Sequence, residues 1–179
     1  MTTSDIVAAA NLSVGARKLL TPELGPSRFV NLLESHGLFK DAVQFLAHGL
    51  PIEIAVKWAC ACSRELLPPP LLDQSKEALE SVEAWLDTPD DSARWRARRA
   101  ADESRMSSPV DFVAMAIFLS GGSVTPPEAP VTAPPPFVAS KMVAGSIQLA
   151  VLAQTPENAA LRYRKTLQLS RDIARPARK

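Results

Sequence analysis

Apolar residues recur along this sequence at the three- and four-residue spacing of amphipathic helices, and the broadest such pattern covers residues 51–67. On a helical wheel of about 100° per residue, Glu53, Lys57 and Arg64 fall in one narrow sector, and apolar side chains occupy well over half of the circumference. A helix with so wide an apolar surface is typically surrounded by other helices. The pattern predicts a buried helix at the centre of an all-α protein, with Trp58 in the core.

Further helices are predicted on both sides of this central one. Capping residues, apolar spacing and helix-ending Pro or Gly residues place them at about residues 4–10, 14–20, 26–36, 39–48, 71–86, 92–105, 110–119, 137–154 and 156–174. Gly37 and Gly49 follow two of these helices, in the position where a left-handed glycine commonly ends a helix. The predicted fold class is therefore all-α, a compact bundle of roughly eight to ten helices.

Proline marks the boundaries between these elements. The 16 prolines occur in clusters, and the segment 123–136, SVTPPEAPVTAPPP, has the periodicity of neither a helix nor a strand. We expect it to cross the bundle as an extended strap; the alternative is a proline motif that a partner's aromatic groove recognises. Residues 1–179 are expected to form a single domain, with 1–25 as a candidate loosely packed N-terminal appendage.

Composition places the chain among globular proteins. Hydrophobic residues make up 46% and charged residues 22%, which argues against general disorder. No run of about 18 apolar residues is present to span a membrane, and the N-terminus lacks the basic and apolar regions of a secretory signal. We therefore expect a cytoplasmic protein without a membrane segment.

Charge is divided unevenly along the chain, although the formal net charge is only +1. Residues 1–93 contain 7 Lys and Arg against 13 Asp and Glu, whereas residues 94–179 contain 13 against 6. Residues 162–179, which include the C-terminal RPARK, are the most strongly basic stretch. Surfaces of opposite sign favour recognition of a charged partner or pairing of two copies.

Three groups of charged residues are the candidate partner-binding residues. They are Glu77, Glu80 and Glu83; Arg94, Arg96, Arg98 and Arg99; and Arg162, Arg164, Lys165 and Arg171. Helical spacing predicts that the last group faces outward, while Ala160, Tyr163, Leu167 and Ile173 face the core. The alternatives are a solvated helix surface in each case and, for the arginines of 94–105, salt bridges to the preceding acidic helix.

Patterns of catalytic and metal-binding residues are missing from the sequence. Cys60 and Cys62 point about 200° apart on a helix, so they cannot jointly hold a metal, although neighbouring basic residues could favour a Cys60 thiolate. His36 and His48 lie in the last turns of predicted helices, where the negative end of the helix accounts for them. We predict no enzymatic activity, no cofactor, and no catalytic or metal-binding residue.

Five stretches taken together resemble an uncharacterised family of small all-helical bacterial proteins. They are FLAHGLP (45–51), AVKWACACSREL (55–66), VEAWLDTPDDSAR (82–94), FLSGGSVTPP (118–127) and RYRKTLQLSRDIA (162–174). The resemblance covers residues 12–174. Members are sometimes labelled twin-arginine translocation proteins, but Arg98 and Arg99 lie in the middle of the chain with no apolar segment after them. The label is therefore not supported.

Genes of the family often lie near type VI secretion components, and this association supplies the functional hypothesis. The resemblance implies a non-enzymatic adaptor or chaperone that binds a secreted effector or a spike component. The helix around Trp58 is also similar to helical immunity proteins, so neutralisation of a cognate toxin is the first alternative. A weak nucleic-acid-binding regulator, using the arginines of 94–105 and the basic C-terminus, is the second.

Overall fold

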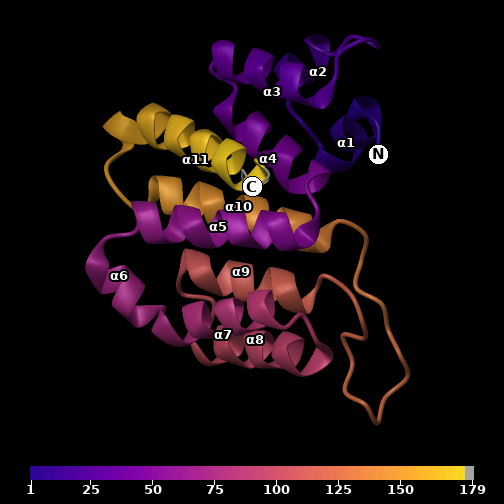
Figure 1. Cartoon of the computed structure of the whole chain (residues 1–179), viewed down its shortest axis with the longest axis vertical. Coiled ribbons are helices and arrows are strands. Elements are labelled where there is room, and N and C mark those ends of the chain that lie inside the picture. The colour runs from indigo at the N-terminus through magenta and orange to yellow at the C-terminus, as the bar shows by residue number, and fades with distance from the viewer. Residues whose placement is uncertain (176–179) are drawn as a thin grey trace.

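The structure, a computed structural model, describes residues 1–175. These residues form eleven α-helices and one short 3₁₀ helix, with no β-strand (Figure 1). The α-helices are α1 (Thr3–Ala10), α2 (Val14–Lys18), α3 (Pro26–Ser35), α4 (Phe39–Gly49), α5 (Ile52–Leu66), α6 (Pro69–Gln74), α7 (Lys76–Asp87), α8 (Asp91–Glu103), α9 (Pro109–Phe118), α10 (Val138–Leu152) and α11 (Ala159–Ala174), and the 3₁₀ helix is η1 (Pro156–Asn158). The predicted all-α fold is confirmed. None of the helices within the described residues is long and apolar enough to cross a membrane.

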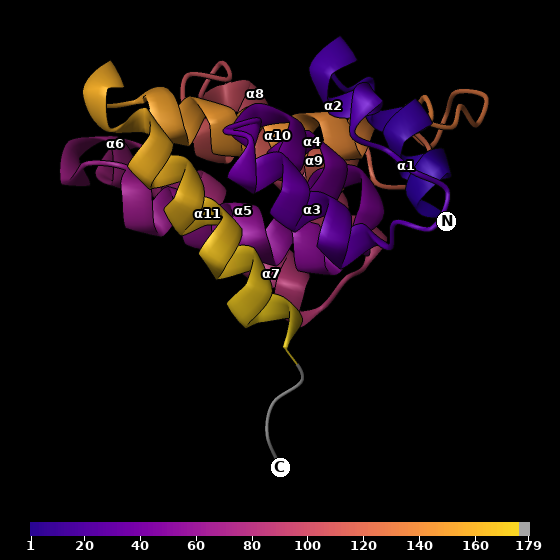
Figure 2. The same cartoon turned by 90° about the horizontal axis from the view of Figure 1, so that it is seen from above.

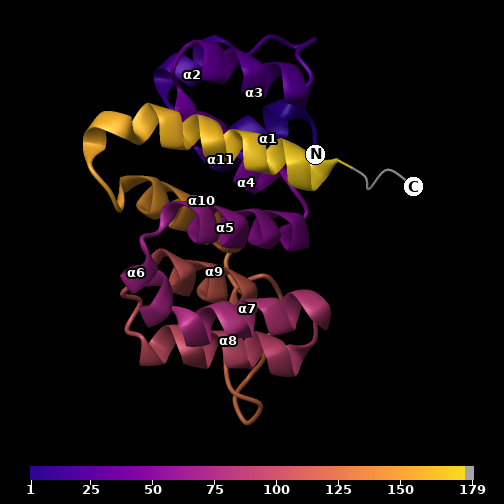
Figure 3. The same ribbon diagram turned by 60° about the vertical axis from the view of Figure 1, so that its left-hand side comes forward.

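Helices α5 and α10 lie side by side through the middle of the molecule (Figures 1 and 3). On one side α4 and α11 cover this pair, and α11 crosses α5 obliquely (Figure 2). On the other side lie α9 and the α7–α8 hairpin. Because α5 contacts α7, α9, α10 and α11, it has the central place predicted from its apolar circumference.

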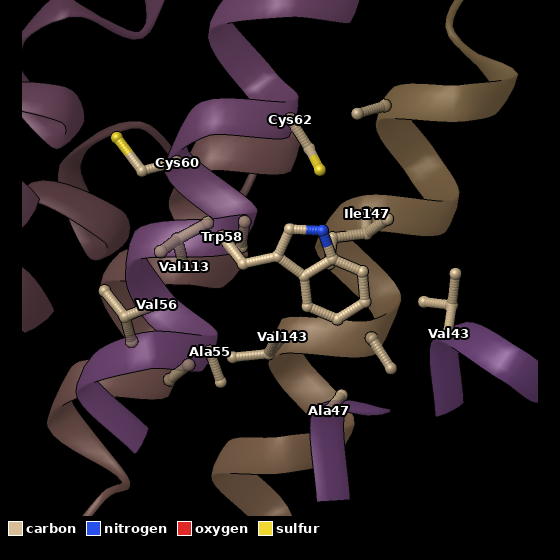
Figure 4. Close-up of a cluster of buried hydrophobic side chains, with 14 of the residues drawn as sticks. Val43, Ala47, Ala55, Val56, Trp58, Cys60, Cys62, Val113, Val143 and Ile147 are labelled. Atoms are coloured by element: carbon tan, nitrogen blue, oxygen red, sulfur yellow. The ribbon is translucent and has the colours of Figure 1, made fainter. Parts of the chain in front are cut away.

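Trp58 joins the central pair of helices, α5 and α10, to α4 and α11. Its side chain is fully buried, and its indole points from α5 towards α10 and α4 (Figure 4). The indole Nε1–H donates a hydrogen bond of 2.7 Å to the Thr166 carbonyl of α11. The labelled neighbours of the ring in Figure 4 include Val43, Ala47, Val143 and Ile147. Trp58 is thus a core residue as predicted, and it also fixes α11 against α5.

The N-terminal helices belong to the bundle. Ile6, Val7 and Ala10 of α1 are buried in the common core, and α1 packs on α4. The Asp41 carboxylate of α4 accepts hydrogen bonds from the Ser13 backbone N–H, at 2.7 Å, and from the Ser13 hydroxyl, at 2.9 Å, just before α2 begins. The expectation of a loosely packed appendage is therefore wrong for α1 and the start of α2.

Two helix boundaries differ from the sequence expectation. The single helix predicted at 71–86 is divided at Ser75, which is buried and donates its hydroxyl to the Leu71 carbonyl, 2.7 Å away. Gly37 has the predicted left-handed conformation, with φ of 71°. Gly49 is the last residue of α4 and does not have a left-handed conformation. Gly49 instead lets α1 come close, because a Cβ there would lie 2.9 Å from Ile6 Cδ1.

The proline loop, residues 123–136, connects α9 to α10 and projects from the helices (Figures 1 and 3). It folds back on itself: Val124 N–H donates to the Thr132 carbonyl at 2.8 Å, and Ala129 N–H donates to the Pro126 carbonyl at 3.0 Å. Val131 of this loop is 86% exposed. The loop joins two helix ends as predicted, but it does not lie across the bundle as a strap.

Candidate protein-binding groove

An open groove of about 580 Å³ lies between α1, α3, α4 and the C-terminal half of α11. Its apolar lining includes Ile6, Val30, Phe45, Leu46 and Leu50, and its polar lining includes Ser27, Asn31, Ser170, Arg171 and Arg175. Most of the exposed area inside it is apolar. Open grooves with an apolar lining are one kind of surface on which the apolar face of a helix can dock.

Contacts between distant parts of the chain give the groove its walls. The Phe29 and Phe45 rings meet edge to face at a centroid distance of 5.0 Å, which packs α3 against α4. The Arg171 guanidinium forms an ion pair with Glu34, joining α11 to α3. Gly49 permits the close approach of α1 at the other wall. The groove therefore depends on packing between helices that are far apart in sequence.

Residues 1–175 contain no cluster of three or more His, Cys, Asp or Glu side chains that could hold a metal ion. Both cysteines are buried, and their side chains lie on opposite sides of α5 (Figure 4). Burial raises the pKa of Cys60, and this effect outweighs the opposing influence of the neighbouring Arg64. Burial also raises the pKa of Cys62. Arg64 thus favours the Cys60 thiolate as the sequence suggested, but burial favours the thiol more strongly.

Two of the predicted partner-binding arginines lie inside the protein, and Arg94 is the first. Only 5% of it is exposed. Its Nη1 donates to the Phe118 carbonyl at 2.7 Å, and its Nη2 donates to the Ser123 carbonyl at 2.9 Å. Phe118 ends α9, where the last carbonyls have no partner within the helix. Arg94 therefore caps α9 and holds the base of the proline loop, and it is not a surface contact residue.

Arg162 has the same role at the end of α10. It is 8% exposed, and it donates from Nε to the Val151 carbonyl at 2.6 Å and from Nη2 to the Thr155 carbonyl at 2.5 Å. A cation at this position complements the negative end of the helix. The predicted orientation of α11 is therefore wrong at this point, because Arg162 faces inward and Ala160 is exposed.

The other charged candidates lie at the surface with different surroundings. The exposed ones include Arg96, Arg99, Arg164, Glu77 and Glu80. Three others form ion pairs, Glu83 with Arg64, Lys165 with Glu65 and Arg98 with Asp102. Among the ion pairs of residues 1–175, none joins α7 to α8, so the expected salt bridges between these two helices do not form. Of the C-terminal RPARK sequence, only Arg175 falls within the described residues.

Arg171 is the only predicted candidate that lines the groove in the described part of the chain. The predicted acidic surface on α7 and the exposed basic residues of α8 lie away from it (Figure 1). The apolar lining was not predicted as a site, since each of its residues has the spacing of an ordinary core residue. The pairing of acidic and basic surfaces between two copies remains a prediction.

The histidines lie at helix ends, as predicted. Nδ1 of His36 is 2.9 Å from the Leu32 carbonyl, and Nδ1 of His48 is 2.8 Å from the Gln44 carbonyl. His48 is buried, and its Nε2 has no hydrogen-bond partner among the described residues. Burial lowers the pKa of His48, and the charge of Lys141 lowers it further. The neutral imidazole is therefore the form that the fold favours.

This burial predicts a pH dependence of stability. In the unfolded chain His48 takes up a proton near its ordinary pKa of 6.5, whereas the folded state resists protonation. The free energy of unfolding is thus expected to be highest above about pH 6.5 and to fall as the pH decreases below it. Urea denaturation between about pH 7.5 and 5 should show this slope, and His48→Leu should reduce it. Equal slopes in the wild type and His48→Leu would contradict the prediction.

The fold is all-α, and the groove between α1, α3, α4 and α11 has a mostly apolar lining. The chain belongs to DUF6931, a family of unknown function, whose sequence model matches residues 29–174. The expectation that the chain belongs to an uncharacterised family is thereby confirmed. Helices α1 and α2, which precede residue 29, fall outside the match. No curated protein and no solved structure matches the chain.

Proposed function

We propose that the protein is a non-enzymatic accessory factor that binds the apolar face of a helical segment from another protein. The groove between α1, α3, α4 and α11 carries this proposal. Its lining combines an apolar floor with Arg171 and Arg175 at the side of α11; Arg171 pairs with Glu34, whereas Arg175 lies beside Asp172 but is largely exposed. The partner segment is thus an amphipathic helix with acidic residues along one edge.

The biological setting that we propose is bacterial protein secretion. The sequence resemblance described above favours a cytoplasmic adaptor or chaperone of a type VI system, with a secreted effector or a spike component as the partner. A helix-binding groove suits that role because such a protein must recognise and release a segment of its cargo. The exposed Glu77 and Glu80 favour the alternative of an immunity protein that meets a basic toxin. Nucleic-acid binding is less well supported, because the buried Arg94 and Arg162 are not available to phosphates.

A tryptophan placed on the rim of the groove tests the proposal. Ser27 is exposed and lines the groove, so Ser27→Trp fills the groove without burying a charge. Ser35→Trp, on the same helix but outside the groove, is the matched control. The purified chain and both variants are used as bait in lysates of the native host. We expect Ser27→Trp to lose a secretion effector or spike component, with affinity lowered about tenfold or more, while Ser35→Trp retains it.

Each outcome of this experiment has a definite meaning. Recovery of a single toxin, lost with Ser27→Trp, would replace the adaptor role by the immunity role. Equal recovery by both tryptophan variants would remove the groove as the binding site. Circular dichroism and thermal melting of each variant show beforehand that the fold is retained.

A further inference from the structure

We propose that the proline loop (residues 123–136) is a preorganised ligand for an aromatic-lined groove on a partner protein. This site is separate from the apolar groove bounded by α1, α3, α4 and α11. The proposal rests on three features of the loop: the way its base is held, the hydrogen bonds within it, and the chemistry of its exposed segment.

A buried arginine holds the base of the loop. Arg94 Nη2 donates to the Ser123 carbonyl at 2.9 Å, and Arg98 Nη1 lies 3.5 Å from the Val124 carbonyl. Gly122 is left-handed, with φ of 65°, and a Cβ there would lie 2.9 Å from Arg94 Nη2. Burying a guanidinium is costly unless its donors are satisfied. The chain thus combines a buried charge and a left-handed glycine to fix where the loop begins.

Hydrogen bonds also fix the shape of the loop beyond its base. The Thr125 hydroxyl donates to the Pro130 carbonyl at 2.6 Å, and the Ser123 hydroxyl oxygen accepts from the Thr132 backbone N–H at 3.2 Å. Val124 N–H completes this set by donating to the Thr132 carbonyl. No residue from 123 to 136 belongs to the hydrophobic core. These bonds therefore order a segment that adds nothing to core packing.

The exposed part of the loop has the chemistry of a polyproline ligand. Proline fixes its own φ and restricts the preceding residue to extended conformations, so Ala133 to Pro136 is held in or near polyproline geometry. Val131 is 86% exposed beside this segment. Glu128 is the only charged residue from 112 to 140. The complementary surface is a groove of aromatic side chains with a basic residue near the place of Glu128.

Preorganisation is the advantage of such a ligand. A flexible segment loses conformational freedom on binding, and this loss reduces affinity. The proline loop is already ordered by Arg94 and by its internal hydrogen bonds, so less freedom is lost when a partner binds. The intact protein should accordingly bind more tightly than a free peptide of the same sequence.

The test compares full-length variants as bait in lysates of the native host. Val131→Asp places a charge in the proposed contact, and Val14→Asp is the matched control because Val14 is an exposed valine on α2. A synthetic peptide of residues 123–137 is the competitor, and a scrambled peptide is its control. We expect to capture a partner protein whose affinity falls about tenfold or more with Val131→Asp and is unchanged with Val14→Asp. The loop peptide should displace this partner, and the scrambled peptide should not.

Three results would overturn the proposal. The first is that no captured protein depends on Val131 or is displaced by the loop peptide. The second is a captured protein whose binding site contains no aromatic groove. The third is a dimer of this chain, detected by sedimentation, that Val131→Asp dissociates. Binding lost with Ser27→Trp but retained with Val131→Asp belongs to the apolar groove, so the two proposals can fail independently.

Discussion

Replacing Arg94 with alanine is expected to lower the free energy of unfolding by about 2–4 kcal/mol, because it removes a buried charge that has three partners. Arg94 Nε donates to the Asp91 carboxylate at 2.8 Å, and the other two bonds end at the Phe118 and Ser123 carbonyls. Without the guanidinium, the Phe118 carbonyl loses a donor at the end of α9. The Phe118 ring also loses the cation that lies 4.9 Å from its centroid.

Urea denaturation monitored by circular dichroism measures this loss, and two further variants identify its source. Arg96→Ala, at an exposed position of the same helix, should change stability by no more than about 0.5 kcal/mol. Arg94→Lys keeps the charge but not the planar fork, so it should recover only part of the loss. Amide exchange in the proline loop should accelerate in Arg94→Ala. Equal losses for Arg94→Ala and Arg96→Ala would contradict the structural role of Arg94.

Local sequence patterns were sufficient for most of the helices. The helix predicted at 110–119 is observed at Pro109–Phe118, because Ser108 and Asp111 form a capping box around a proline in the first turn. Capping and apolar spacing act within a few residues, so they are visible without the fold. The break at Ser75 was missed because the apolar spacing continues through it, and that spacing does not reveal the turn in which Ser75 N–H donates to the Leu72 carbonyl.

The buried arginines show where local patterns become insufficient. Arg94 falls on one helical stripe with the buried Ala97 and Ala101, and this spacing could have indicated its inward direction. Arg162 shares its stripe with Thr166 and Ser170, which are polar although buried, so no apolar pattern marks that face. Each arginine donates to one carbonyl at the end of another helix and to one in the connection after that helix, and such partners are visible only once the helices are placed.

The apolar groove could not be predicted for a related reason. Ile6, Val30 and Leu46 have the periodicity of core residues, and periodicity does not distinguish a core contact from a groove lining. Whether these side chains line a groove or fill a core depends on how α11 is placed relative to α1 and α3. Among the charged residues predicted to bind a partner, only Arg171 lines the groove in the described part of the chain. The uneven distribution of charge along the sequence did not distinguish Arg171 from the other candidates.

Replacing Trp58 with alanine is expected to lower the free energy of unfolding by about 3–5 kcal/mol, because it leaves a cavity where the central layers meet. The indole lies between α5, α10 and α4 (Figure 4), and it is bonded to α11 through the Thr166 carbonyl. Trp58→Phe keeps much of the volume and removes the N–H, so its expected cost is smaller, about 1–2 kcal/mol. Thermal and urea unfolding of both variants measure these losses, and amide exchange in α11 should rise in each.

Trp85→Phe separates the hydrogen bond from the loss of ring volume. Trp85 of α7 is also buried, but its indole N–H is not among the side-chain hydrogen-bond donors of residues 1–175. Trp58→Phe should therefore cost more than Trp85→Phe, and only Trp58→Phe should loosen α11. If the two substitutions have equal effects and α11 stays protected, the bond from Trp58 to Thr166 does not hold α11 in place. The stability of the groove would then depend on the Arg171–Glu34 ion pair and on apolar packing alone.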